Sequence, residues 1–244
     1  MSYKTALITG ASRGIGRAIA LSMASAGYHL MLTCHRNQDM LTELAHQIES
    51  RYPVTCLTYA GDMGDYEAVQ KMYACFQQRF ASLDVIVNNA GISHMGLLTD
   101  MNPEEWDRIM ATNLSSVFYT CRYGIPIMLR KKTGKIINIS SVWGVAGASC
   151  EAAYSASKGG VNALTKALAK ELGPSNIQVN AIACGAIDTQ MNDWMTEEDL
   201  ESLLIEIPAG RLGRPEEVAH LVLNLCSGNE YLTGQVIHLD GGWI

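Results

Sequence analysis

The sequence predicts an α/β fold, built as a doubly wound parallel sheet of about seven strands with helices on both faces. Short apolar segments alternate with amphipathic helical segments along the 244 residues, which is typical of strand–helix–strand units. Several of these apolar segments show no polar alternation, as in a parallel sheet that is covered on both faces. No internal repeat or linker-like stretch interrupts this order, so we expect one domain over residues 1–244.

The expected strands share an apolar run that leads into a polar or glycine-containing turn. They cover residues 5–9, 28–33, 54–59, 84–88, 136–139, 177–183 and 235–239. The expected helices follow the strands and carry apolar residues at helical spacing. They cover residues 15–26, 37–52, 65–80, 103–129, 154–172 and 215–226. Residues 188–214 are too long for a simple connection, and we expect them to act as a lid over a substrate.

Composition excludes several classes of protein. The net charge is −6 and the basic residues are not clustered, which argues against nucleic acid as the main partner. The seven cysteines are odd in number and form no Cys-x-x-Cys pair, which argues against a disulfide framework and a zinc site, so we expect no metal. No apolar run approaches the roughly 18 residues of a membrane helix. We therefore expect a cytoplasmic protein.

A glycine-rich turn follows the first expected strand and opens the first expected helix. Gly10, Gly14 and Gly16 allow the backbone to approach a pyrophosphate, and the helix start offers free N–H groups. The alternative is a plain tight turn. If the turn binds a dinucleotide, the expected contacts are Gly10, Ser12, Arg13, Gly14, Ile15 and Gly16.

Further candidates for cofactor binding follow the next three expected strands. An acidic residue after the second strand would favour NAD, whereas positions 34–36 carry His35 and Arg36 and no acid. Cations suit a 2′-phosphate, so we expect NADP(H), although ordinary loop charge is the alternative. The candidates after the third and fourth strands are Asp62, Met63, Asn89, Ala90 and Gly91.

Ser141, Tyr154 and Lys158 suggest acid–base chemistry. Tyr154 and Lys158 are four residues apart, so a helix places them on one face. A lysine ammonium favours the phenolate and is expected to lower the tyrosine pKa from about 10, which makes it usable near neutral pH. Ser141 ends a strand, where its hydroxyl can hold a substrate oxygen. On spacing alone, a half-buried ring beside a solvated lysine is the alternative. Asn113 falls in the middle of an expected helix, where asparagine is unfavourable. It can bend the helix, hold a water or lie exposed on the surface, and the sequence does not choose among these.

These motifs together resemble the short-chain dehydrogenase/reductase family over essentially the whole chain. The resemblance implies a Rossmann-like fold and hydride transfer between a nicotinamide and a ketone. It also implies roles: Tyr154 is the general acid, Lys158 lowers its pKa and binds the nicotinamide ribose, Ser141 positions the carbonyl and Asn113 holds a water. It further implies that Asp62 contacts adenine and that Ile187 and Thr189 contact the carboxamide. A homotetramer is usual in this family.

Two substrate classes are implied by narrower resemblances. Residues 211–217 and 233–242 are similar to those of 3-oxoacyl-acyl-carrier-protein reductases. Arg130, Lys131 and Lys132 fit the basic residues that such enzymes often place near the entrance to hold an acidic carrier protein, and the alternative is that they complement the dipole at a helix C-terminus. Residues 141–151 and 185–192 are similar to elongation factor P 5-aminopentanone reductases, whose substrate ends in an ammonium. Trp143 and Glu151 are then substrate candidates, with Glu151 pairing with the cation or merely starting a helix. Cys184 departs from the proline common in relatives. A non-catalytic dinucleotide sensor is the remaining alternative.

Overall fold

The computed structural model describes residues 3–193 and 195–244. Trp194, which falls within the expected lid, lies outside the described residues. The strands are β1 Lys4–Ile8, β2 Tyr28–Cys34, β3 Cys56–Ala60, β4 Val85–Asn88, β5 Gly134–Ser141, β6 Ile177–Cys184 and β7 Val236–Leu239. The helices are α1 Gly14–Ser25, α2 Gln38–Arg51, α3 Tyr66–Arg79, α4 Pro103–Met110, α5 Ser116–Leu129, α6 Trp143–Ala146, α7 Ala152–Leu172, α8 Glu197–Glu206 and α9 Pro215–Cys226.

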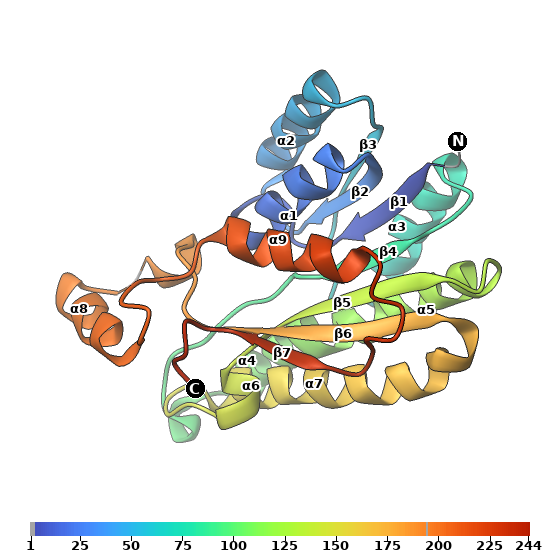
Figure 1. Ribbon diagram of the computed structural model, residues 1–244. Coiled ribbons are helices and arrows are strands. Elements are labelled where there is room, and N and C mark those ends of the chain that lie inside the picture. The colour runs from blue at the N-terminus through green and yellow to red at the C-terminus, as the bar shows by residue number, and fades with distance from the viewer. Residues whose placement is uncertain (1–2, 194) are drawn as a thin grey trace.

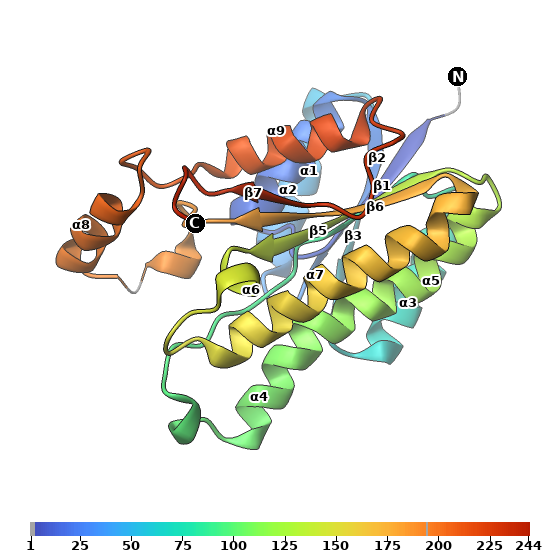
Figure 2. The same cartoon turned by 60° about the horizontal axis from the view of Figure 1, so that its bottom comes forward.

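The seven strands form one sheet in the order β3-β2-β1-β4-β5-β6-β7, and every pairing is parallel. Helices α1, α2 and α9 cover one face, and α3, α5 and α7 cover the other (Figures 1 and 2). The structure therefore confirms the predicted doubly wound α/β fold. Each expected strand is present, and its ends differ from the expected ones by at most two residues.

Two hydrophobic cores form because the strands are apolar on both sides. On the first face, Ile19 of α1, Leu44 of α2 and Val222 of α9 pack against the sheet. On the second face, Phe76 of α3 and Val161 of α7 do the same. This double coverage buries the whole of β4 and β6 and leaves the carboxyl ends of the strands as a polar edge.

A chain of buried polar side chains crosses the centre of the sheet. Thr120 of α5 donates to Asn88 Oδ1 at 2.6 Å, and Asn88 Nδ2 donates to Asn138 Oδ1 at 2.8 Å. Asn138 Nδ2 then donates to Thr165 Oγ1 of α7 at 2.8 Å. Because buried amides without partners are costly, these bonds tie α5, β4, β5 and α7 into one arrangement.

The expected helix over residues 103–129 is divided. A π-helical turn over Ala111–Ser115 separates α4 from α5, so the chain continues as a helix with one local widening. Such turns are frequent at functional sites. The expected lid contains α8, which projects beyond the carboxyl ends of the strands and buries none of its residues (Figure 1).

Among the described residues, no helix combines the length and the apolar character needed to cross a membrane. All seven cysteines are free thiols. No group of three or more His, Cys, Asp or Glu side chains within residues 3–193 and 195–244 is arranged to hold a metal ion.

Candidate active site

Ser141, Tyr154 and Lys158 come together at the carboxyl edge of the sheet. Ser141 is the last residue of β5, and the first two turns of α7 carry the other two. The Ser141 hydroxyl lies close enough to Tyr154 to lower the pKa of its phenol, and it accepts a bond from the Trp143 backbone N–H at 3.1 Å. The Lys158 ammonium lies 5.6 Å from the centre of the Tyr154 ring. The ring is half-buried, and its hydroxyl can therefore meet a ligand at this edge.

The pKa of Tyr154 is shifted in the opposite direction to the one expected. Burial raises the pKa of the Tyr154 phenol well above its ordinary value, and this is the largest effect. The Ser141 hydroxyl lowers the pKa, whereas the nearby Glu151 and Cys184 raise it further. Lys158 does not reverse this effect because its ammonium donates to the carbonyl oxygen of Ile139 at 2.8 Å. The raised pKa makes Tyr154 a weaker acid than an exposed phenol, so its proton is transferred only to an oxygen on which negative charge develops.

The pKa of Lys158 is also shifted by burial. Its side chain is 5% exposed, and desolvation lowers the pKa to about 8. Cys184, which pairs with Ser141 across β5 and β6, opposes this shift. Burial raises the pKa of the Cys184 thiol to about 12, so it is neutral and acts as a small packing group beside the ammonium.

Asn113 lies in the π-helical turn and is buried, which excludes the surface alternative. Its Oδ1 accepts from the Ile92 N–H at 2.8 Å, and its Nδ2 donates to the Ile92 carbonyl at 2.9 Å and to Ser157 Oγ at 3.0 Å. Ser157 in turn donates to the Tyr154 carbonyl at 2.7 Å. Asn113 thus joins the segment after β4 to the catalytic face of α7.

The glycine turn has the geometry of a phosphate cradle. Gly10 and Gly14 have φ values of +64° and +53°, which favour glycine. A Cβ on Gly16 would lie against the Gly10 carbonyl and 2.6 Å from Asn89 Nδ2. Arg13 is the N-cap of α1 and makes no side-chain cap bond within the described residues, so the first N–H groups of the helix are available to an anion.

The segment after β4 supports this turn from the other side. Thr9 Oγ1 accepts from the backbone N–H groups of Asn89 and Ala90 at 3.0 Å each. Asn89 Nδ2 donates to the carbonyl oxygens of Thr9 and Gly10, also at 3.0 Å. A Cβ on Gly91 would lie 3.4 Å from both Asn113 Oδ1 and Lys158 Nζ, so the backbone there runs directly past the catalytic groups. The residues that could hold a dinucleotide thus run from Gly10 past Gly91 to Lys158.

The remaining cofactor candidates differ in their surroundings. His35 and Arg36 are exposed just beyond β2, whereas Met63 is buried after β3. Asp62 Oδ1 accepts from the Gly64 N–H at 2.8 Å and shapes the turn there. Arg13, a further cation in the glycine turn, is held elsewhere than beside His35 and Arg36. Its guanidinium donates to Gln190 Oε1 at 2.8 Å.

Ser12, Ile187 and Thr189 lie around the same turn. Ser12 and Ile187 are buried, and Ile15 packs against the first core. The Thr189 methyl carbon would be 3.3 Å from a Cβ placed on Gly14, so the start of the expected lid rests on the glycine turn. The residues predicted from the sequence as cofactor contacts thus form two neighbouring groups, one at the turn and one beyond β2 and β3.

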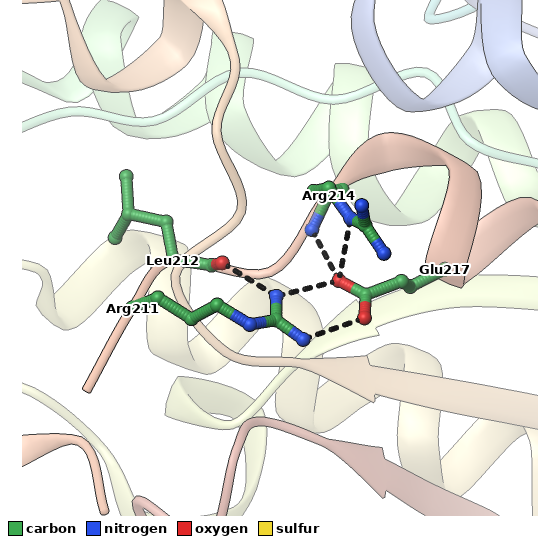
Figure 3. Close-up of polar contacts among 4 residues, drawn as sticks. All are labelled: Arg211, Leu212, Arg214 and Glu217. Carbon is green, nitrogen blue, oxygen red and sulfur yellow. Dashed lines mark hydrogen bonds and ion pairs between the residues drawn. The ribbon is translucent and has the colours of Figure 1, made fainter. Parts of the chain in front are cut away.

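The far end of the expected lid is fixed by an ion-pair network (Figure 3). Arg211 Nη2 lies 2.7 Å from Glu217 Oε1, and its Nη1 donates to the Leu212 carbonyl at 3.0 Å. The backbone N–H of Arg214 donates to Glu217 Oε2 at 2.8 Å. These bonds lower the pKa of the Glu217 carboxyl to about 2, and the bond with Arg211 is the main cause. The lid end is therefore anchored at the first turn of α9.

The substrate candidates Trp143 and Glu151 lie near Ser141 and Tyr154, whereas the basic residues 130–132 do not. Trp143 begins α6 two residues after Ser141, and its side chain lies close enough to Glu151, the N-cap of α7, to lower the pKa of that carboxyl. Arg130, Lys131 and Lys132 precede β5 and thus lie at the opposite edge of the sheet, with Lys131 paired to Asp84 at 2.6 Å. The expectation that they flank the entrance of this chain's own site is therefore wrong.

Sequence reasoning missed three residues that support the site. Thr9 was visible as the polar residue before Gly10, and Ser157 as a second hydroxyl between Tyr154 and Lys158. Trp243 lies far away in sequence, yet its ring meets Trp143 with 4.7 Å between ring centres. No local pattern predicts such a contact.

Comparison with known proteins decides the family. The model of the short chain dehydrogenase family matches residues 4–200. The chain belongs to the short-chain dehydrogenase family. Membership makes it an oxidoreductase of the kind that binds a nicotinamide dinucleotide, in agreement with the cradle described above.

Several curated relatives cover nearly the whole of this short-chain dehydrogenase. An uncharacterized oxidoreductase of Bacillus subtilis (strain 168), YmfI, is 41% identical over 241 residues, or 98% of each chain. The 3-oxoacyl-[acyl-carrier-protein] reductase FabG of Staphylococcus aureus (strain N315) is 41% identical over 240 residues, covering 98% of this chain and 97% of the relative. FabG of Thermotoga maritima is 39% identical over 244 residues, covering 99% and 98%.

Proposed function

We propose that this protein is an NADPH-dependent reductase that converts a ketone to a secondary alcohol, with a 3-oxoacyl thioester on acyl-carrier protein as substrate. The observation that carries the proposal is the convergence of Ser141, Tyr154 and Lys158 at the carboxyl edge of the sheet, with the Lys158 ammonium 5.6 Å from the centre of the Tyr154 ring. The 3-oxoacyl thioester follows from the FabG relatives.

The proposed residues divide the work of carbonyl reduction. A bound nicotinamide dinucleotide supplies the hydride. Ser141 donates a hydrogen bond to the carbonyl oxygen, and Tyr154 gives it a proton as negative charge develops there. Lys158 stabilises the phenolate that results, and we propose that Asn113 holds the adjoining backbone and a water for proton return. Residues 188–214 act as the lid.

NADPH rather than NADH is proposed from the two exposed cations beyond β2. His35 and Arg36 are exposed just beyond β2, where an NAD-type site would carry an acid, and positions 34–36 carry none. Arg36→Glu should therefore reverse the preference, raising the KM for NADPH and lowering the KM for NADH. An unchanged ratio of the two KM values would contradict the choice of NADPH.

Turnover by purified protein tests the reaction. We expect NADPH consumption with acetoacetyl-carrier protein, and Tyr154→Phe should lower kcat by about 10²–10⁴-fold, as for loss of a general acid. Cofactor affinity, measured by calorimetry, should stay within twofold of the wild-type value because the phenyl ring is kept. A dinucleotide sensor would instead bind NADPH without consuming it, and the substitution would change nothing.

A second substrate is favoured by Glu151. This half-buried carboxyl has its pKa raised by burial, and no ion pair with a lysine, arginine or histidine is formed within the described residues. A buried carboxylate is stabilised by a cation, which the ammonium of the 5-aminopentanone group on a modified lysine of elongation factor P would provide. Glu151→Gln should then raise the KM for the aminoketone and leave the KM for a neutral ketone unchanged.

The assembly and location also belong to this proposal. Phe118 on α5 is 51% exposed, which supports packing of this helix against a second copy in a homotetramer. Light scattering of the purified protein tests the tetramer, and a monomeric mass would contradict it. We propose a cytoplasmic location, which fractionation of cells tests.

A further inference from the structure

Two tryptophans from distant parts of the chain meet beside the proposed active site. Trp143 begins α6, and Trp243 lies in the segment after β7. Their rings cross at 64° with 4.7 Å between centres, which is an edge-to-face contact. Both rings are half-buried, so the pair forms part of the surface around the carboxyl edge rather than of either core.

Trp243 also contacts the proposed lid. Its indole Nε1 donates to Glu206 Oε2 at 3.3 Å, and Glu206 is the last residue of α8. Ala209, three residues beyond the end of the lid helix, is held to the same segment, because its N–H donates to the Gly241 carbonyl at 3.1 Å. The lid is thus attached to residues 240–244 at two points.

The segment after β7 is held in a fixed turn by its own hydrogen bonds. Asp240 Oδ1 accepts from the Gly242 N–H at 3.0 Å, and Asp240 Oδ2 accepts from the Ile244 N–H at 3.2 Å. Gly241 and Gly242 have φ values of +69° and +84°, which allow this tight turn. The Asp240 backbone packs on Gly185, where a Cβ would come within 2.7 Å of it.

Trp143 connects to the catalytic groups in two ways. Its backbone N–H donates to Ser141 Oγ at 3.1 Å, and its side chain lies close enough to Glu151, the N-cap of α7, to lower the pKa of that carboxyl. Helix α6 cannot move independently of α7, because a Cβ on Gly144 would lie 2.7 Å from the Lys158 carbonyl carbon. A displacement of the Trp143 ring therefore reaches Ser141 and the first turn of α7.

We infer that Trp243 is a positioning residue that couples the lid to Ser141 through its contact with Trp143. Glu206 on the lid orients the Trp243 indole, and the indole edge in turn fixes Trp143 and the backbone that holds the catalytic hydroxyl. When α8 changes position, this connection shifts the orientation of Ser141 toward the substrate oxygen. The inference rests on the proposed reduction of a ketone, in which Ser141 holds that oxygen.

Two substitutions of Trp243 test the coupling in the full-length protein. Trp243→Ala removes the ring, and we expect the KM for the ketone to rise about three- to tenfold, the effect of losing one aromatic pair. The dissociation constant for NADPH should stay unchanged, because the contacts of Trp243 described above are with Trp143 and Glu206 and not with the glycine turn. Trp243→Phe keeps an aromatic edge and should restore most of the KM. The fully exposed Tyr231 supplies the control substitution, Tyr231→Ala, which should change neither value.

Hydrogen exchange separates this inference from the proposed function. In the cofactor-free protein, Trp243→Ala and Glu206→Ala should both speed exchange of the α8 amides, whereas Glu206→Gln, which keeps an acceptor oxygen, should not. Unchanged α8 exchange in Trp243→Ala would overturn the coupling whether or not the protein turns over. If exchange responds as expected while the wild-type protein reduces no ketone, the coupling of lid to Trp143 stands and the proposed reaction fails.

A double substitution provides the second check. If Trp243 acts through Trp143, then Trp143→Ala with Trp243→Ala should raise the KM no more than Trp143→Ala alone. Strictly multiplicative effects would show that the two residues act independently and would overturn the inference. An equal loss of kcat, cofactor affinity and thermal stability in Trp243→Ala would also overturn it, since that result indicates a general structural role.

Discussion

The Lys158 ammonium donates a hydrogen bond to the main-chain carbonyl oxygen of Ile139 in β5 at 2.8 Å. The lysine is therefore held by β5 and not by the Tyr154 hydroxyl. This contact fixes the ammonium below the ring while the phenol remains free to meet a substrate. It also means that the charge of Lys158 is compensated by a dipole and not by a carboxylate, which leaves the group sensitive to pH.

The buried lysine predicts a specific dependence of stability on pH. Its pKa is about 8 in the folded protein and about 10.4 in an unfolded chain. Between these values the unfolded state binds more protons, so the free energy of unfolding gains from Lys158 as pH rises, by at most about 1.4 kcal/mol per pH unit. Urea unfolding of wild type and Lys158→Met at pH 8 and pH 10 measures this: the wild-type value should rise relative to the variant. A constant difference would contradict the lowered pKa.

Gly16→Ala should abolish the phosphate cradle. The added Cβ meets the Gly10 carbonyl and lies 2.6 Å from Asn89 Nδ2, so the turn or Asn89 must move. We expect the affinity for NADPH to fall about tenfold or more, which corresponds to about 1.4 kcal/mol, as measured by calorimetry. Gly173→Ala is the matched control because nothing lies within 4 Å of its Cβ position. Equal affinities of the two variants would argue against a cradle at this turn.

Asn113→Ala should destabilise the fold by about 1–3 kcal/mol, because it leaves the Ile92 N–H and carbonyl without their buried partner. Chemical unfolding of the purified protein gives this value. Asn37→Ala is the control: Asn37 is the N-cap of α2, but its side chain makes no cap bond within the described part of the chain. A small effect at Asn113, comparable with that at Asn37, would show that the side chain does not fasten the segment.

Glu217→Gln should loosen the end of the lid in a pH-dependent way. The folded-state pKa of Glu217 is about 2, below its ordinary value of 4.5, so its stabilising effect is present above pH 4.5 and lost as pH falls toward 2. The wild-type protein should therefore melt above the variant at pH 7, and the two melting temperatures should converge as the solution is acidified. A gap that stays as large below pH 2 as at pH 7 would exclude the ion pair as its source.

Much of the fold and the site followed from local patterns. The strand–helix alternation and the glycine turn are encoded within segments of about 20 residues, and Tyr154 and Lys158 lie one helical turn apart, so their common face was predictable. The direction of the Tyr154 pKa was not, because it depends on burial by residues from β5, β6 and α7. The contact of Trp143 with Trp243 joins distant segments and has no sequence signal, whereas Asn113 marked the interruption of its helix without showing that it takes the form of a π-helical turn.

The buried chain from Thr120 through Asn88 and Asn138 to Thr165 has a consequence for how the sheet assembles. Apolar side chains tolerate many pairings, so β4 and β5 would fit together almost as well one residue out of step. Such a slip would leave two amides in the core without partners, and the misaligned chain would carry a heavy energetic penalty. The four polar groups therefore select the observed register of β4 and β5. This register fixes the position of Ser141 at the carboxyl edge of the sheet.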